Sequence, residues 1–259
     1  TNQWLMRNYP SKVYVSPKSP VRCILTTEGD FIDSTRKQEV ILYRNLKRID
    51  LNTTINWGGR KNMGLRLCFP IKAHKPSVTY EVPFAAVKYG EEHPFARPST
   101  FRGIRNWIDI SSPDFGLTIA TQNTPTDFKE RIDSHDFLIQ PILLLTTVDW
   151  GFYHTQEGEY TFQFALMPYK GNLKIWKTTR FGWEHNNSLI PIVNPTPTRS
   201  QLPESLRFCQ ISSPNVILST IKQAENGKGI ILRLYETDGK DTPLKIKFFK
   251  LFKTARLTN

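Results

Sequence analysis

The sequence lacks the patterns that mark helices and membrane spans. Apolar residues rarely recur at a spacing of three or four, and no apolar run approaches the ~18 residues that a transmembrane helix needs. Its 18 prolines and 14 glycines punctuate short stretches in which apolar residues recur at every second position. The sequence therefore predicts an all-β chain without a membrane-spanning segment.

Cysteine is scarce as well. The three thiols, Cys23, Cys68 and Cys209, are far apart, odd in number and set in apolar contexts typical of strands. Scattered cysteines of this kind indicate buried free thiols rather than a disulfide framework. Because free thiols are typical of a reducing compartment, we expect a cytoplasmic protein.

Motifs of catalysis and metal binding are missing from the chain. None of the five histidines lies three or four residues from a cysteine or another histidine, so their spacing builds no zinc site. There is also no Gly-x-Ser-x-Gly turn, no glycine loop for phosphate and no dinucleotide fingerprint. We therefore predict no catalytic residue, no metal ligand and no cofactor within the chain.

The charge is high but carries no pattern. The chain has 35 Lys and Arg against 23 Asp and Glu, a net charge of +12, and the basic residues form no run of five. The sequence matches no RNP-like, zinc-finger or helix-turn-helix pattern. A solvated basic surface is the favoured interpretation, and no nucleic-acid partner is expected. A nucleic-acid binder would instead show salt-sensitive retention on heparin.

Strand periodicity is clearest in two places. The stretch Glu39–Trp57 alternates on both sides of a polar turn at 44–47, which predicts a hairpin with one buried face. Residues 160–166 alternate aromatic or aliphatic with smaller or polar side chains, so we expect Phe164 in the core. Further strands are expected at 12–15, 21–27, 64–70, 79–82, 107–110, 116–121 and 137–148, with a long loop at 90–105.

The composition changes between Pro191 and Pro203, where four prolines suit a stiff connector. Three further strands are expected after it, at 215–222, 229–236 and 243–252, with hairpin turns at Asn226-Gly227 and Asp238-Gly239. The sequence thus predicts a large β-sandwich over residues 1–200 and a small one over 201–259. The small unit is too short to be stable alone, so we expect it to pack against the large one.

Two segments combine aromatic rings with polar groups in the way that sugar sites do. A ring covers the apolar face of a sugar, while charged and amide groups bond its hydroxyls. The first segment supplies Arg102, Arg105, Asn106, Trp107 and Asp109, and the second supplies Trp150, Tyr153 and His154. The alternative is structural: an indole in the core beside a paired carboxylate. The structural interpretation is favoured for the second segment. For the first segment the two interpretations are about equally favoured.

Several motifs in fixed order carry a resemblance to a known family. Residues Glu39–Tyr43, Lys47–Asp50 and Ile55–Trp57 are similar to "eI.LY…kRvD…vdW", and Leu67–Pro70 and Tyr80–Phe84 to "l…FP" and "YevPfG". Further matches are Asn106–Asp109, Gly158–Phe162 with Ala165–Tyr169, Asn187–Leu189, Pro214–Lys222 and Gly229–Glu236. Over about residues 20–259, the chain resembles the C-terminal β region of α-mannosidases of glycoside hydrolase family 38. Ala85 and Tyr169 depart from the family's Gly and His.

The resemblance implies a fold and a missing partner. It implies a galactose-mutarotase-like β-sandwich (supersandwich) followed by a small β-sandwich. Family members cleave α-mannosides with retention, using two carboxylates and a zinc ion held by His and Asp. Those residues belong to an N-terminal catalytic domain, for which this chain has no counterpart. The resemblance therefore implies zinc in that domain, and no catalytic residue is carried over to this chain.

Our leading hypothesis is the C-terminal β region of such an α-mannosidase, inactive alone, which supports its own N-terminal catalytic domain. Its segment Arg102–Asp109 would reach the rim of the sugar site and contact α-mannoside glycans. The alternative is a stand-alone carbohydrate-binding or assembly module. The start at Thr1 resembles a cut inside a longer protein. A domain cut from its neighbour should expose an apolar patch where that neighbour docked, and oligomerisation through this patch is left open.

Overall fold

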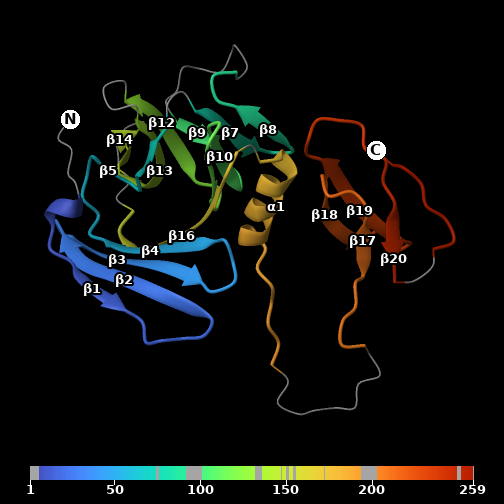
Figure 1. Ribbon diagram of the computed structural model, residues 1–259, viewed down its shortest axis with the longest axis horizontal. Coiled ribbons are helices and arrows are strands. Elements are labelled where there is room, and N and C mark those ends of the chain that lie inside the picture. The colour runs from blue at the N-terminus through green and yellow to red at the C-terminus, as the bar shows by residue number, and fades with distance from the viewer. Residues whose placement is uncertain are drawn as a thin grey trace.

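The computed structural model describes residues 6–73, 76–91, 101–131, 136–146, 148–149, 152–153, 156–171, 173–193, 203–249 and 252–258 (Figure 1). A 3₁₀ turn, η1 (Met6–Asn8), precedes the first strand. A short hairpin of β14 (Val148–Asp149) and β15 (Phe152–Tyr153) lies outside the two main sheets. No helix in the described ranges is long and apolar enough to cross a membrane.

A nine-stranded antiparallel sheet forms the larger layer, in the order β1-β2-β3-β4-β16-β11-β10-β7-β8. Its centre joins distant segments, because β16 pairs with β4 on one side and with β11 on the other. Its strands are β1 (Lys12–Val15), β2 (Arg22–Phe31), β3 (Ser34–Tyr43), β4 (Ile49–Trp57), β7 (Ser77–Val82), β8 (Ala85–Lys88), β10 (Trp107–Ser111), β11 (Gly116–Ala120) and β16 (Gly158–Tyr169).

A five-stranded sheet forms the second layer. Its strands are β5 (Met63–Arg66), β6 (Phe69–Lys72), β9 (Phe101–Gly103), β12 (Pro125–Arg131) and β13 (Asp136–Thr146). β13 is its central strand, paired with β12 along one edge and with β6 and then β5 along the other. The register of the β13–β5 pair shifts between Ile142 and Leu144. Pro141 immediately precedes this bulge, which accords with the rule that proline in a strand marks an edge or a bulge.

The hydrophobic core lies between these two sheets. On β4 the side chains of Leu51, Ile55 and Trp57 are buried at alternate positions, and Phe164 of β16 is 1% exposed. Burying a side chain of this size stabilises the fold by about 1.5–3 kcal/mol. The predicted hairpin at Glu39–Trp57 and the predicted core strand at 160–166 are therefore confirmed.

A helix that the periodicity did not predict, α1 (Ile175–Asn186), packs on the other face of the large sheet. Its buried residues are mostly small or polar: Thr178, Thr179, Phe181, Gly182 and His185. Such a face gives no apolar repeat in the sequence. The first turn has no acidic residue, and Lys174 makes no side-chain capping bond, so the usual start signal is missing too.

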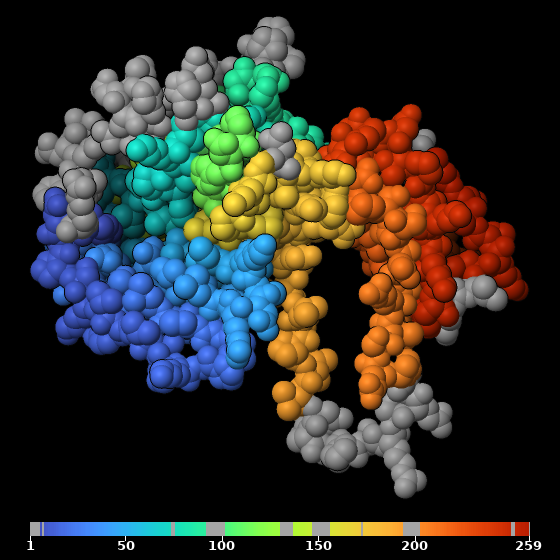
Figure 2. All heavy atoms as spheres, in the orientation of Figure 1, coloured from blue at the N-terminus to red at the C-terminus, as the bar shows by residue number. Residues whose placement is uncertain are grey.

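The small C-terminal unit consists of two two-stranded sheets. One pairs β18 (Val216–Gln223) with β19 (Ile230–Glu236), as the Asn226-Gly227 turn predicts. The other pairs β17 (Cys209–Ile211) with β20 (Ile246–Phe248), which is shorter than the strand expected at 243–252. Figure 2 shows this unit, orange to red, standing against the yellow helix α1. An all-β chain with a large sandwich followed by a smaller β unit is thus confirmed.

Two other expectations need correction, and one is untested. Cys23 and Cys68 are exposed and Cys209 is half-buried, so the thiols are free but not buried. Cys23 lies on β2, beyond the part of the large sheet that the second sheet covers. The loop expected at 90–105 contains strand β9, while its residues 92–100 lie outside the described residues. Most of the proline-rich connector, residues 194–202, also lies outside them.

Candidate functional site

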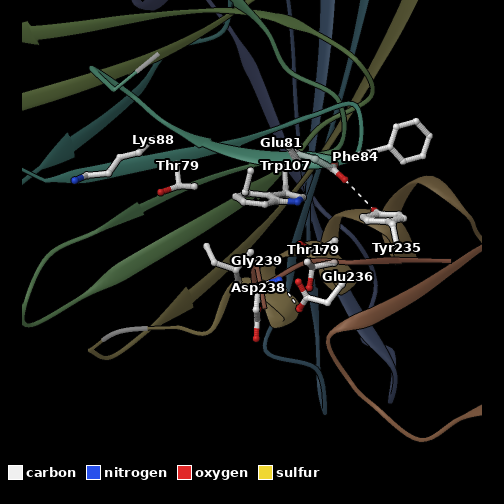
Figure 3. A pocket seen from close by; sticks show the side chains of 14 residues that line it. Thr79, Glu81, Phe84, Lys88, Trp107, Thr179, Tyr235, Glu236, Asp238 and Gly239 are labelled. Atoms are coloured by element: carbon white, nitrogen blue, oxygen red, sulfur yellow. Dashed lines mark hydrogen bonds between the residues drawn. The ribbon is translucent and has the colours of Figure 1, made fainter. Parts of the chain in front are cut away.

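A cavity of about 370 Å³ lies between three parts of the fold. Hairpin β7–β8 forms one wall, α1 a second, and the chain after β19 a third (Figure 3). Phe84, Lys88, Trp107, Tyr235 and Asp238 line it. The volume is at the lower end for small-molecule pockets. The large sandwich and the small unit therefore meet around a space that could hold a small molecule or water.

Glu81 of β7 joins these parts through one buried carboxylate, 3% exposed. Its Oε2 accepts the backbone N–H of Asn106 at 3.1 Å, and its Oε1 accepts the indole N–H of Trp183 at 3.2 Å. The Tyr235 hydroxyl of the small unit donates to the same Oε1 at 3.5 Å. Burial raises the pKa of Glu81, while hydrogen bonds from Asn106 and Trp183 and the positive charge of nearby Arg105 oppose the shift. The burial of Tyr235 raises its pKa to about 12.

Arg105 and three aromatic rings surround this carboxylate. The guanidinium carbon lies 5.6 Å from the ring centre of Phe84 and 5.8 Å from that of Trp183. The ring of Tyr235 packs edge-on against Phe84, with centroids 5.6 Å apart, and lies 6.2 Å from Trp183. Cation–π and edge-to-face contacts each contribute about 0.5–1.5 kcal/mol. The small unit is thus held to the sandwich through Tyr235.

The turn that carries Phe84 is strained. Pro83 and Phe84 alone connect β7 to β8, and Phe84 has φ +62°. Proline suits the first central position of a type II turn, but the second requires positive φ and favours glycine. A phenylalanine there costs about 1–3 kcal/mol in strain. Its ring contacts with Tyr235 and Arg105 offset that cost.

A second buried carboxylate, Asp109, lies beneath α1. Thr118 donates its hydroxyl to Oδ1 at 2.7 Å, and Tyr169 donates to Oδ2 at 2.7 Å. Burial raises the pKa of Asp109, and hydrogen bonds from Thr118, Tyr169 and Thr178 oppose the rise. Burial and the negative charge of Asp109 also raise the pKa of Tyr169. Tyr169 therefore helps to hold a buried structural carboxylate.

The chain after β19 is held by Glu236. Burial raises the pKa of this carboxyl, but the backbone N–H groups of Asp238 and Lys240 and the amide of Asn215 lower it by more. Two other atoms at the cavity remain without a hydrogen-bond partner within the described protein: Nε1 of Trp107 and Oδ1 of Asp238. The lining therefore contains one buried donor and one buried acceptor that the described protein leaves unpaired.

The structure brings together part of the predicted sugar segment. Arg105, Asn106 and Trp107 lie at the cavity or beside it, but Trp107 is 0% exposed and Asn106 is 9% exposed. Asp109 is buried under α1, and Arg102 lies over Tyr89, its guanidinium carbon 5.7 Å from that ring centre. Trp150, His154 and the side chain of Tyr153 lie outside the described residues. Sugar binding by these eight residues stays a prediction.

Sequence reasoning missed Glu81, Phe84, Trp183 and Tyr235. The first two lie inside the Tyr80–Phe84 motif, and Tyr235 lies inside Gly229–Glu236, so the motifs themselves were the available signal. Within the parts of the chain that the structure describes, no three His, Cys, Asp or Glu side chains could hold a metal ion. The zinc that the resemblance implies concerns a domain outside this chain and stays a prediction.

Two family models match the chain in order. One, described as "Glycosyl hydrolases family 38 C-terminal domain", matches residues 3–125. The other, described as "Glycosyl hydrolases family 38 C-terminal beta sandwich domain", matches residues 215–259. The first covers most of the large sandwich up to the start of β12, and the second covers the small unit from Asn215 onward.

Curated relatives are longer proteins. The chain is 27% identical over 215 residues to "Alpha-mannosidase 2C1" of Homo sapiens, covering 80% of this chain and 19% of that protein. It is 24% identical over 238 residues to "Alpha-mannosidase G" of Dictyostelium discoideum, covering 86% and 20%. The chain thus spans about a fifth of the length of these relatives.

A solved structure shares the fold. An alpha-mannosidase from Enterococcus faecalis matches with a TM-score of 0.74 at 15% identity, over 93% of this chain and 31% of that one. Coverage this wide includes both the large sandwich and the small unit. With both family models matched in sequence order, this chain belongs to the C-terminal region of the glycosyl hydrolases of family 38.

Proposed function

We propose that this chain is the C-terminal β region of a glycosidase that hydrolyses α-mannosides, and that it supports a catalytic domain in the same polypeptide. The succession of the two C-terminal family models along one chain carries the proposal. The names of its relatives, alpha-mannosidases of which it spans about a fifth, support the substrate class.

The buried carboxylates support a structural role for the chain. Glu81 and Asp109 both accept hydrogen bonds from within the fold and lie under α1 or the small unit. A retaining glycosidase needs two carboxyl groups about 5–5.5 Å apart that flank the sugar. Glu81 and Asp109 are enclosed by protein instead. We therefore assign hydrolysis of the α-mannoside, and the zinc ion that it uses, to the catalytic domain.

The test is the activity of the complete reading frame in which this chain lies. We expect the whole polypeptide to release 4-nitrophenol from 4-nitrophenyl α-mannoside with retention, as followed by NMR of the first-formed anomer. A zinc chelator should abolish turnover, and the chain alone should have none. A complete polypeptide without α-mannosidase activity under zinc-replete conditions would overturn the proposal.

A second function, carbohydrate binding by the chain alone, is favoured by the cavity with its unpartnered donor and acceptor. Phe84 is 64% exposed and stands at this cavity, so its ring can cover a sugar face. The test is a titration with mannose and methyl α-mannoside, followed by tryptophan fluorescence. Saturable binding that Phe84→Ala removes and Leu257→Ala keeps would support it. No binding up to tens of millimolar would leave the chain a scaffold.

A further inference from the structure

The apolar side of the large sheet extends beyond the second sheet. Four large apolar side chains on β1–β3 are exposed: Val13 (61%), Val15 (66%), Leu25 (39%) and Leu42 (49%). We call them the β1–β3 apolar face. Solvated strands normally present polar side chains to water, and contiguous exposed apolar patches on soluble proteins tend to mark contact surfaces.

The strand register places these residues on the side that faces the core. Directly paired residues of antiparallel strands share a face. Val15 pairs with Leu25, Leu25 with Val40, and Val40 with Leu51, which is in the core. Leu42 pairs with Ile49, two residues before Leu51, so it lies on the same side. The β1–β3 apolar face is therefore an uncovered continuation of the core surface.

The turns at one end of this face extend the surface and carry charge of one sign. Val21 (63%) and Leu46 (59%) are exposed there, and the backbone N–H of Arg44 bonds the carbonyl of Val21 at 3.0 Å. The two turns, residues 16–22 and 44–47, contain Lys18, Arg22, Arg44 and Lys47 and no Asp or Glu. Arg48, which follows, is paired with Asp50 and contacts His185 of α1 instead. A complementary partner would have an apolar centre and carboxylates at its edge.

We propose that the β1–β3 apolar face is the docking surface for the catalytic domain that precedes this chain in the same polypeptide. This inference rests on the proposed function. About four-fifths of each relative's length lies outside the part that matches this chain, enough for such a domain. Local geometry agrees: η1 leads directly into β1, and the ring of Tyr9 packs against Phe31 at the end of β2, centroids 6.5 Å apart.

The tether from Thr1 to the face is short. From Thr1 to the start of β1 at Lys12 the chain spans at most about 40 Å when fully extended. A domain that precedes Thr1 is therefore tethered within about that distance of Val13 and Val15. The small unit lies across α1 from β1–β3 and leaves this side of the molecule uncovered (Figure 1).

The thiol of Cys23 reports on this face directly. Cys23 is exposed and pairs with Leu42, so it lies on the β1–β3 apolar face, whereas exposed Cys68 lies between β5 and β6. The experiment compares maleimide labelling of Cys23 in this chain and in the complete polypeptide, read by peptide mass spectrometry with Cys68 as internal reference. We expect Cys23 to react about tenfold more slowly in the complete polypeptide, because docking buries its thiol.

Variants locate the contact. Val15→Glu and Leu42→Glu place charge on the face, and each should restore Cys23 labelling in the complete polypeptide. Tyr14→Glu is the matched control, because Tyr14 is 48% exposed on the opposite side of β1. Equal labelling of Cys23 in the chain and in the complete polypeptide would overturn the docking surface. Slow labelling of Cys23 in this chain alone, which becomes slower as the chain's concentration rises, would also overturn it. A second copy of the chain would then cover the face.

The two proposals fail in different ways. A complete polypeptide that hydrolyses α-mannosides while Cys23 stays reactive refutes only the docking surface. A complete polypeptide without that activity refutes the proposed function, whatever the labelling of Cys23.

Discussion

Trp183 donates its indole N–H to Oε1 of Glu81 at 3.2 Å, across 102 residues of sequence. The bond fixes α1 against β7, next to the edge strand β8 of the large sheet, and Tyr235 brings the small unit to the same carboxylate. Three parts of the chain therefore depend on one buried acceptor. A change at Glu81 should loosen the helix and the small unit together.

Glu81→Gln should destabilise the protein. Both carboxylate oxygens accept N–H groups, from Asn106 and Trp183, and neither donor can reverse its role. The glutamine side chain has only one carbonyl oxygen, so its NH₂ group would face one of these two N–H donors and leave that donor without an acceptor. We expect the free energy of unfolding to fall by about 1–3 kcal/mol in urea titrations at pH 7. Glu159→Gln, at an exposed strand position, is the control. Equal stability of Glu81→Gln and wild type would contradict this account.

Asp109→Asn should be tolerated, in contrast to Glu81→Gln. Its partners on Thr118 and Tyr169 are hydroxyls, which can accept as well as donate. We expect a change within about 0.5 kcal/mol at pH 7, or a gain in stability, because burial disfavours the charged aspartate. A loss above about 2 kcal/mol in the same urea titration would show that the negative charge itself is needed.

The variant also tests the pH dependence. The folded pKa of Asp109 is raised, so between about pH 3.9, its unfolded value, and the folded pKa the native state binds more protons. Wild-type stability should therefore include a contribution that falls as pH rises through this window. Asp109→Asn should lack it. Unfolding free energies measured from pH 3.5 to 7 for both proteins provide the check, and identical slopes would refute it.

His185 should make α1 sensitive to acid. Burial lowers its pKa, and Arg48 lowers it further, whereas Gln163 and Asp50 oppose the shift. In the neutral form, Nδ1 accepts from Arg48 at 3.1 Å and Nε2 donates to the Gln163 carbonyl at 3.3 Å. The unfolded state then binds more protons, so stability is full above about pH 6.5 and falls as pH drops toward the folded pKa. His185→Gln should flatten the stability profile between pH 5 and 7, and an unchanged profile would argue against this role.

Gly182 sets the approach of α1 to the sheet. A Cβ there would lie 2.9 Å from Cδ1 of Trp107 and 3.0 Å from the Asn106 carbonyl oxygen. Gly182→Val should cost about 1–3 kcal/mol of unfolding free energy through overpacking. Gly103→Ala is the control, because its Cβ would meet nothing within 4 Å. Thermal melts should give a lower melting temperature for Gly182→Val than for Gly103→Ala. Equal melting temperatures would show that α1 can shift without loss of stability.

Phe164→Asp should prevent folding, because Phe164 is 1% exposed in the core. The substitution leaves a cavity and buries an unpaired charge, each of which costs several kcal/mol. Leu257→Asp, at a side chain that is 99% exposed, should fold normally. A soluble Phe164→Asp protein with a cooperative melt would place the core elsewhere.

Strands with one buried face could be predicted from the sequence, because alternation reports burial directly. Leu51, Ile55 and Trp57 follow that rule. Helix α1 could not be predicted in this way, because its buried face of Thr178, Thr179 and Gly182 has no apolar repeat. Its position depends on close packing against the sheet instead.

The site was only half predictable, for a related reason. Asn106 and Trp107 stood out as an amide beside an indole, but a sequence cannot say whether such a pair faces solvent. Trp107 is buried because Gly182 lets the helix approach, and Glu81 matters because Trp183 and Tyr235 reach it from distant elements. Long-range pairs of this kind leave no local pattern.

The position of β16 between β4 and β11 has a consequence for synthesis. Trp57 at the end of β4 pairs with Gly158, which emerges from the ribosome about 100 residues later. At ~5–20 residues per second this interval lasts roughly 5–20 s. During it, the edge of β4 presents unpaired backbone groups and an apolar side, a template for pairing with other nascent chains. The order of the strands therefore delays closure of this sheet until β16 has been made, which leaves the edge of β4 open during synthesis.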